Sequence, residues 1–316
     1  MAEAAHGEQS TIHRCSTFID ESRVLMILIT GATGTIGGAL ARRLTADGVP
    51  FRALVRREGV TIPGAEVVVG DLDDPATLPE AFVGVSQLFL NTPGPYPDEE
   101  PVIAQQLAAI DAAVAAGVEH VVKVSAVGAR AGGPMPFGTH AKIEAYLADS
   151  GLAGTVLRPN TVMQNLVRGI TIFTPDGDLF EAFGGKIAHV DARDVADCAF
   201  AVLTGSAPRG GAHDLTGPGA LTAAELAAAL SAALDREIGL VQPDLDELEP
   251  ILVGQGMPES YVKHFVELAR LVTAGALAEV TTAVTDLTGN SPRSIEAFIA
   301  EHRDQLRGVP AKSFWA

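Results

Sequence analysis

A glycine-rich turn between an apolar run and an amphipathic segment limits the folds that this chain can adopt. Residues 24–30, VLMILIT, form an apolar run that is typical of a parallel strand covered on both faces. Gly31, Gly34 and Gly37 follow at intervals of three, and residues 36–48 then have helical periodicity. Glycines at these points allow a sharp turn, a close backbone approach to a pyrophosphate, and tight helix–sheet packing.

Strands and helices continue to alternate as far as residue 159, and this predicts an α/β fold with a doubly wound parallel sheet. Further strands are expected at 51–55, 65–70, 86–91, 120–126 and 154–159. The alternation then breaks: 161–185 has no clear period, 186–190 is expected to be a strand, and a helix should begin after Asp191. The rest is mainly helical, with a final helix near 291–307.

These patterns predict a Rossmann-type domain with a smaller, mainly helical substrate lobe. The nucleotide-binding domain is expected to comprise residues 24–160 plus 186–205, and the lobe 161–185 plus 206–316. Residues 1–23 are mixed polar and contain no apolar core of a signal peptide, so we expect a flexible leader. Either Met1 or Met26 could be the true start.

Composition excludes several classes of partner. The formal net charge is −17, which argues against nucleic acid or an anionic membrane as the main partner. No apolar run reaches 18 residues, so no membrane span is expected. Two cysteines, Cys15 and Cys198, suggest neither a disulfide framework nor a metal site and fit the reducing cytoplasm. We expect a monomer or homodimer that acts on a small apolar molecule.

The turn itself is expected to hold a phosphate group. A helix N-terminus presents free N–H groups and a partial positive charge to an anion. Thr33, Thr35 and Ile36 stand beside the glycines, and the two hydroxyls offer further donors. The alternative is a tight strand–helix turn that binds no ligand.

The end of the second expected strand indicates which dinucleotide is bound. NAD-binding domains usually place an acidic residue there to accept from the ribose 2′-hydroxyl. This chain has Arg56 and Arg57 instead, and guanidinium groups suit a 2′-phosphate. NADP(H) is therefore preferred over NAD(H), although both arginines could simply solvate a loop.

Other strand ends supply the remaining expected cofactor contacts. Asp71 could accept from the adenine amino group, with Leu72 against the ring, or it could be only a turn residue. Further cofactor contacts are expected where the fourth and sixth strands end, at Asn91, Thr92, Pro93, Pro159 and Asn160.

The chain lacks the Tyr-x-x-x-Lys pair in which an ammonium group lowers the pKa of a phenol. His140 and Glu144 are spaced to share one helix face, so His140 is a candidate proton donor that Glu144 would orient. Ser125 is a candidate for contact with the substrate or the cofactor ribose. His140 could instead have only a structural or cofactor-positioning role.

An apolar substrate wall is expected where the chain leaves the sixth strand. The candidates are Met163, Phe173, Phe180 and Phe183. The alternative for each is a place in the core of the lobe.

Several segments together resemble the NmrA-like, atypical branch of the short-chain dehydrogenase/reductases. They are ILITGATGTIGGALARRL, ALVR, GDLDDPATL, HAKIEAYLADSGLAGTVLRPNTVMQN, DARDVADCAFAVL and DLTGPGALTAAELAAAL, which span about residues 24–307. Triphenylmethane reductases and type-2 quinone oxidoreductases are members. The resemblance implies NADP(H) on the glycine turn, no Tyr–Lys pair, and a His-x-x-x-Glu that His140 and Glu144 match. Isoflavone-reductase-like members have a lysine near the place of His140, which puts a lysine acid in doubt here.

Two functions follow from these expectations. The first is an NADPH-dependent reductase that transfers hydride to a quinone, enone, imine or carbonyl compound. The second is a regulatory protein that senses NADP(H) without turnover, because the founding member of the family is such a sensor. A nucleotide-sugar epimerase is disfavoured because the Tyr–Lys pair is missing.

Overall fold

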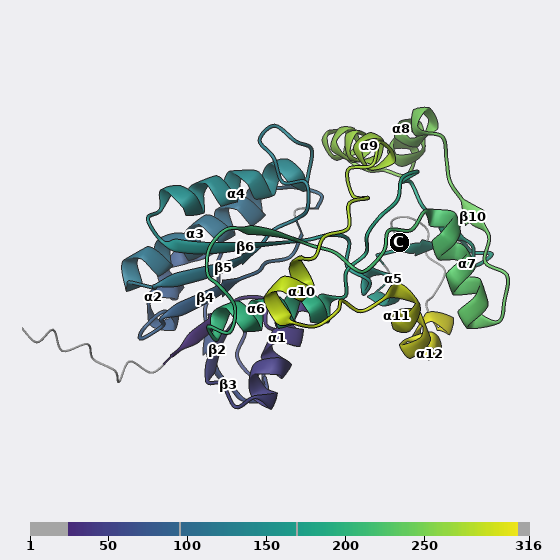
Figure 1. The fold of residues 1–316 in the computed structure, drawn as a ribbon. Helices are drawn as coiled ribbons and strands as arrows, with labels where there is room; N and C mark the ends of the chain where they lie inside the picture. Colours follow the sequence, from purple (N-terminus) through teal and green to yellow (C-terminus); the bar gives the residue numbers. More distant parts are fainter. Residues whose placement is uncertain (1–24, 95, 169, 309–316) are drawn as a thin grey trace, which may run out of the picture.

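The computed structural model describes residues 25–94, 96–168 and 170–308, so the expected leader lies outside the described residues. Two lobes stand side by side in Figure 1, with a strand-rich lobe on the left and helices α7, α8, α9, α11 and α12 on the right.

The larger lobe is built on seven parallel strands in the order β3-β2-β1-β4-β5-β6-β9. The chain builds outwards from β1 on one side and then crosses to β4 on the other, so the switch point lies between β1 and β4. The predicted doubly wound sheet is confirmed. The strands are β1 Ile27–Ile29, β2 Phe51–Val55, β3 Ala65–Val69, β4 Gln87–Leu90, β5 His120–Val124, β6 Ala153–Pro159 and β9 Ala212–Leu215.

Helices cover both faces of this sheet because alternate strand side chains point to opposite sides. Ile27 and Ile29 join the core under α1 (Thr35–Ala46) and α6 (Ala192–Leu203). Leu28 joins the core under the other layer. That layer comprises the 3₁₀ turn Pro75–Thr77, α2 Leu78–Ala81, α3 Glu100–Ala116 and α4 Phe137–Asp149.

The smaller lobe has a core of its own around a three-stranded sheet in the order β10-β8-β7. A second cluster packs α8 against α9 at the top right of Figure 1. The elements of this lobe are α5 Asn165–Arg168, β7 Ile172–Phe173, β8 Leu179–Phe180, α7 Ala223–Leu234, β10 Leu240–Val241, α8 Leu245–Gly254, α9 Glu259–Thr273, α11 Ile295–Glu301 and α12 Arg303–Arg307.

Two segments expected in the small lobe belong with the large sheet. Strand β9 pairs with β6 through four residue pairs, although the sequence places 206–316 in the lobe. Its sequence, AHDL, contains no apolar run and stands between glycine- and proline-rich segments. Helix α10 (Ala283–Thr288) also belongs with the large sheet, because it packs on α6. The final helix is also divided, because α11 ends at Glu301 and α12 begins at Arg303.

The strand expected at 186–190 does not form. The backbone N–H of Ile187 donates to Leu221 O at 2.9 Å, and that of Ala188 to Leu277 O at 3.0 Å. The N–H of Val190 donates to Thr161 O at 3.0 Å. This apolar run is therefore bonded to three different segments in turn, so it crosses between the lobes without entering a regular ladder.

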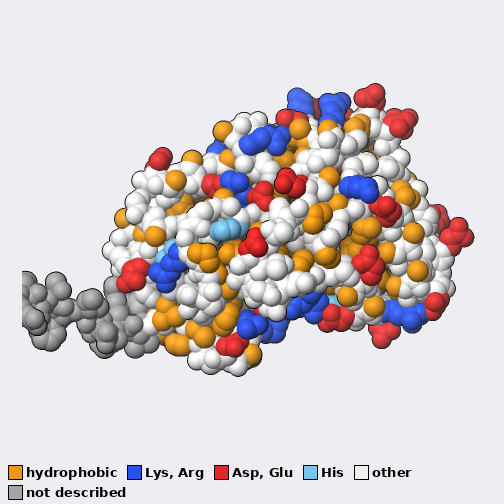
Figure 2. All heavy atoms as spheres, viewed as in Figure 1, with side chains coloured by type: hydrophobic (Ala, Val, Ile, Leu, Met, Phe, Trp, Pro, Cys, Tyr) orange, Lys and Arg blue, Asp and Glu red, His pale blue; other side chains and the backbone are white. Residues whose placement is uncertain are grey.

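Charged side chains of both signs are spread over the surface in Figure 2. On the face in Figure 2, lysines and arginines are interspersed with aspartates and glutamates. Within the described ranges, no helix is long and apolar enough to cross a membrane. The same residues contain no cluster of three or more His, Cys, Asp or Glu side chains arranged for a metal ion.

Candidate functional site

The glycine turn is packed so closely at Gly31 and Gly37 that neither residue has room for a side chain. Gly31 has φ +66°, and a Cβ there would lie 2.7 Å from Asn91 O. A Cβ on Gly37 would lie 2.3 Å from Gly31 O. Gly34 caps α1 without any side-chain hydrogen bond to the first turn. Open N–H groups at a helix start, beside three glycines without side chains, fit the pyrophosphate of a dinucleotide.

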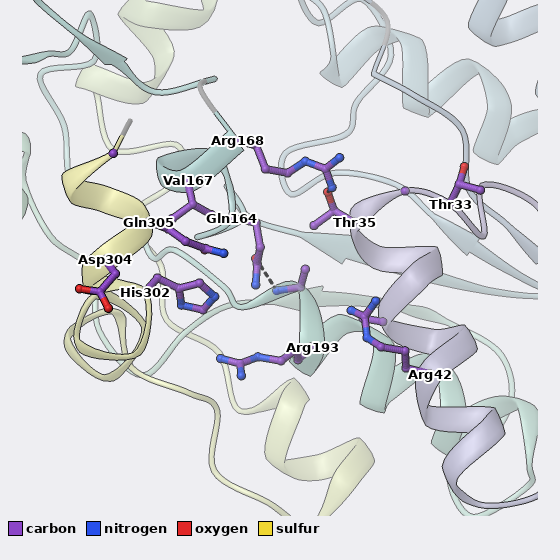
Figure 3. A pocket seen from close by; sticks show the side chains of 14 residues that line it. Thr33, Thr35, Arg42, Gln164, Val167, Arg168, Arg193, His302, Asp304 and Gln305 are labelled. Atoms are coloured by element: carbon purple, nitrogen blue, oxygen red, sulfur yellow. Dashed lines mark hydrogen bonds between the residues drawn. The ribbon is translucent and has the colours of Figure 1, made fainter. Parts of the chain in front are cut away.

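A cavity of about 880 Å³ opens beside this turn and is lined by both lobes. Figure 3 shows Arg168 of α5 reaching Thr35 at the start of α1, and its Nη1 donates to Thr35 Oγ1 at 2.5 Å. Arg42 lines the cavity from α1. Among the described residues neither arginine forms a salt bridge, so both can meet an anion. Sequence reasoning missed Arg168 because it lies 133 residues from Thr35 in the chain.

Other polar groups in this cavity already have partners. Arg193 bonds the buried Asp191 at 2.7 Å and Glu301 at 2.8 Å. Gln164 donates to Asp191 Oδ1 at 2.8 Å and accepts from the N–H of Ala192 at 2.9 Å, the bond dashed in Figure 3. These groups join the end of the small lobe to α6 and shape the cavity wall.

The expected adenosine contacts gather at one edge of the sheet. Val55 pairs with Val69, so Arg56 and Asp71 follow neighbouring strand ends. Arg56 and Arg57 are exposed, and neither forms a salt bridge with a described residue. Asp71 Oδ1 accepts from the N–H of Asp73 at 3.1 Å, as a turn residue does. Leu72 packs against the core beneath α2 and α3.

The loop after β4 has a fixed course beside the switch point. Thr30 Oγ1 donates to Asn91 O at 2.8 Å and accepts from Asn91 N–H at 2.9 Å. Gln106 Nε2 donates to Thr92 Oγ1 at 2.8 Å. Pro93 follows at the surface. Backbone and proline, with few free side chains, therefore border the expected path of the cofactor.

A second cavity, of about 790 Å³, lies between the ends of β5 and β6 and the small lobe. Ser125, Pro159 and Asn160 line it from the sheet. Asn160 Nδ2 donates to Leu277 O at 3.0 Å, which ties the small lobe to the end of β6. Its aromatic lining consists of Tyr96, Phe137, Phe180, Phe183, Tyr261 and Phe265.

Two of the four expected substrate residues lie on this wall. Phe180 and Phe183 line the cavity. Met163 and Phe173 instead lie in the core of the small lobe, where they are 1% and 5% exposed. The correction has a simple cause: an aromatic or Met side chain in an irregular segment gives no sign of the side to which it points.

Ser125 belongs to a polar network behind the cavity. Its hydroxyl donates to Glu144 Oε1, and Arg158 binds the same carboxylate through Nε at 3.0 Å and Nη2 at 2.5 Å. Arg158 also lies 3.9 Å from Asp214 on β9. Because the hydroxyl proton of Ser125 is directed at Glu144, its oxygen can only accept a hydrogen bond from a molecule in the cavity.

His140 has a different partner from the expected one. Its Nδ1 lies 3.1 Å from Nζ of Lys123, which is fully buried in β5, whereas Glu144 binds Ser125 and Arg158. Burial and the neighbouring ammonium group hold the pKa of His140 well below its usual value. Burial also lowers the pKa of Lys123 to about 7. His140 is not among the described residues that line either cavity. A lysine inside the apolar run HVVKV was the signal that sequence reasoning did not use.

A family model described as the NmrA-like family matches residues 25–306. The chain belongs to the NmrA-like family. An NAD(P)H azoreductase from Xenophilus azovorans is 37% identical over 88% of this chain and 98% of its own length.

Solved structures agree with this membership. The Escherichia coli NADPH-dependent quinone oxidoreductase QOR2, complexed with NADPH, has a TM-score of 0.72 at 25% identity, over 88% of this chain and 99% of that one. NmrA, a negative transcriptional regulator, shares the fold at 21% identity with a TM-score of 0.69, over 92% and 99% of the two chains. The close packing at Gly31 and Gly37 fits NAD(P)H binding on this turn.

The buried Lys123 should make stability depend on pH. Its pKa in the folded protein is about 7, against a usual 10.5, so the unfolded chain binds more protons between these values and stability rises with pH there. Replacing it by Met, Lys123→Met, should remove this slope. Relative to the unchanged protein, the free energy of unfolding of the variant should increase most at pH 6, by roughly 1–3 kcal/mol.

Urea unfolding at pH 6, 8 and 10 measures the effect. Lys142→Met is the matched control, because Lys142 is 56% exposed and pairs with Glu99 at the surface. If the free energies of unfolding of Lys123→Met and the unchanged protein differ by the same amount at all three pH values, the pKa of Lys123 is not lowered in the folded protein.

Proposed function

We propose that the protein is an NADPH-dependent reductase that transfers hydride to a small apolar organic acceptor, such as a quinone, enone, imine or carbonyl compound. The observation that carries this proposal is the aromatic-walled cavity at the ends of β5 and β6, where the nicotinamide is expected. The relatives of named activity, an azoreductase and a quinone oxidoreductase, support the oxidoreductase class.

Binding and orientation are the tasks of the residues that line the cavity. Reduced nicotinamide supplies the hydride when the cofactor is bound. Ser125 would accept a hydrogen bond from the carboxamide of the cofactor or from the acceptor, and the aromatic residues would exclude water from the reacting atoms. A proton needed by a neutral acceptor comes from water, which is consistent with the absence of a Tyr–Lys pair.

A sensor of NADP(H) without turnover is the second candidate. A sensor has no need of an open space beside the nicotinamide and can fill it with side chains. The open cavity of about 790 Å³ therefore favours the reductase. We keep the reducing cytoplasm as the expected compartment, in line with the buried free thiol of Cys198.

Loss of NADPH absorbance tests the reductase directly. A panel of quinone, enone, carbonyl, imine and azo acceptors should contain at least one that the purified protein reduces with saturation kinetics. Tight NADPH binding with no consumption across the whole panel would instead favour the sensor.

We also propose that NADPH is preferred over NADH because Arg56 meets the 2′-phosphate. Arg56→Ala should weaken NADPH binding by roughly ten- to a hundredfold, as expected for lost hydrogen bonds to a charged group. NADH lacks this phosphate and should bind the variant almost normally. Equal losses for the two cofactors in a calorimetric titration would contradict the assignment.

Arg168 should contact the pyrophosphate, which NADPH and NADH have in common. Its place over the start of α1 suits the pyrophosphate, so Arg168→Ala should weaken NADPH and NADH by the same factor, roughly five- to twentyfold. Arg236→Ala, which removes an exposed arginine elsewhere in the lobe, is the control. Unchanged affinity in Arg168→Ala would remove this residue from the cofactor site.

A further inference from the structure

The second cavity, at the ends of β5 and β6, is called the acceptor cavity from here on, and one carboxyl group lines it. Among the described residues that line it, Glu181 is the one acidic side chain, and no lysine, arginine or histidine is present. Glu181 follows β8, where its N–H donates to Val241 O at 3.1 Å. Its Oε1 accepts from the N–H of Phe183 at 3.1 Å. The side chain is thus held at the wall by backbone groups.

Glu181 forms no salt bridge with any described residue. Because an unpaired carboxylate in apolar surroundings is costly, burial raises its pKa to about 7. A positively charged molecule in the cavity would supply the missing partner. An anionic acceptor would meet a like charge and no compensating cation.

Aromatic rings stand on the same wall as this carboxyl group. Tyr96 and Tyr261 meet edge to face with centroids 5.4 Å apart. Phe265 lies 6.0 Å from Tyr261 and 5.6 Å from Phe183. The faces of such rings attract organic cations, most strongly where water is excluded. One carboxyl group together with several aromatic rings suits the binding of a flat organic cation.

We propose that this cavity selects planar organic cations, iminium ions above all, with Glu181 as their counter-ion. The inference rests on the proposed reductase function and adds a substrate class to it. A neutral quinone or enone fits the rings but leaves Glu181 without a partner.

An iminium acceptor also agrees with the proton chemistry of the site. Its carbon receives a hydride, with both electrons, from the reduced nicotinamide. The π pair of the C=N bond then becomes the lone pair of the nitrogen. The cation is reduced to a neutral amine and NADPH is oxidised to NADP⁺, so the charges balance and no proton is transferred. A protein acid is unnecessary, and Ser125, whose proton is directed at Glu144, need not provide one.

Two reducible bicyclic probes test the inference: N-methyl dihydroisoquinolinium, which is a cation, and menadione, which is neutral. In Glu181→Gln the ratio of kcat/KM for the cation to that for menadione should fall about tenfold or more, because glutamine keeps the shape of the side chain but cannot carry the negative charge. Glu249→Gln on the exposed side of α8 removes the same charge from the lobe and should leave the ratio unchanged. An unchanged ratio in Glu181→Gln overturns the inference.

Calorimetry provides a readout that does not need turnover. With NADP⁺ bound, no hydride is available, and the cation should bind the unchanged protein more tightly as pH rises from 6 to 8, because the carboxylate becomes ionised. The other titratable groups on the wall, Tyr96 and Tyr261, stay neutral over this range because burial raises the pKa of both phenols. Affinity that is flat or falls with pH overturns the proposal and points to Glu181 as a proton donor.

The two proposals fail separately. If menadione is reduced but the cation is neither bound nor reduced, the reductase stands and the cation-selective cavity is rejected. If neither probe is reduced, the reductase loses support, and the calorimetric titration still decides whether Glu181 binds a cation. If Glu181→Gln does not fold, the pH titration of the unchanged protein still supports or overturns the role of this carboxylate.

Discussion

The close approach of three backbone segments at the head of β1 is the constraint on which the rest of the structure depends. Gly31, Gly37 and the carbonyl group of Asn91 lie so near one another that a methyl group at either glycine would overlap a backbone oxygen. This packing sets the start of α1 and the course of the loop after β4 together. The expected phosphate site and the expected path of the nicotinamide therefore both depend on this packing, at the point where the strand order of the sheet reverses.

Near the carboxyl ends of β5 and β6, charged side chains are partly removed from water, which costs free energy. Lys123, Glu144 and Arg158 lie between the sheet and α4, where apolar residues would pack more cheaply. Arg158 and Ser125 hydrogen-bond to Glu144, so the carboxyl ends of β5 and β6 are fixed relative to α4. The wall of the acceptor cavity thus rests on a rigid polar layer, and His140 belongs to that layer and not to the cavity.

Local patterns in the sequence were enough to predict the sheet, most helices and the glycine turn. The run FRALV, for example, forms a strand at the expected bounds, because its own apolar and β-branched residues and the turn residues on either side are enough to predict it. Contacts that join distant segments were not accessible in this way. Arg168 beside Thr35, β9 beside β6 and Lys123 beside His140 each depend on how the lobes and layers come together. Phe180 and Phe173 differ in the same way, since side-chain direction in an irregular segment is decided by tertiary packing.

The bond from Arg168 to Thr35 makes the two cavities depend on one lobe. It joins the small lobe to the start of α1 beside the first cavity. The same lobe supplies Phe180, Phe183 and Glu181 to the acceptor cavity. Under the proposed function, phosphate oxygens on the glycine turn would compete with the Thr35 hydroxyl for this guanidinium group. A shift of α5 towards the cofactor would then be passed to the wall of the acceptor cavity, so that the occupancy of one cavity would alter the shape of the other.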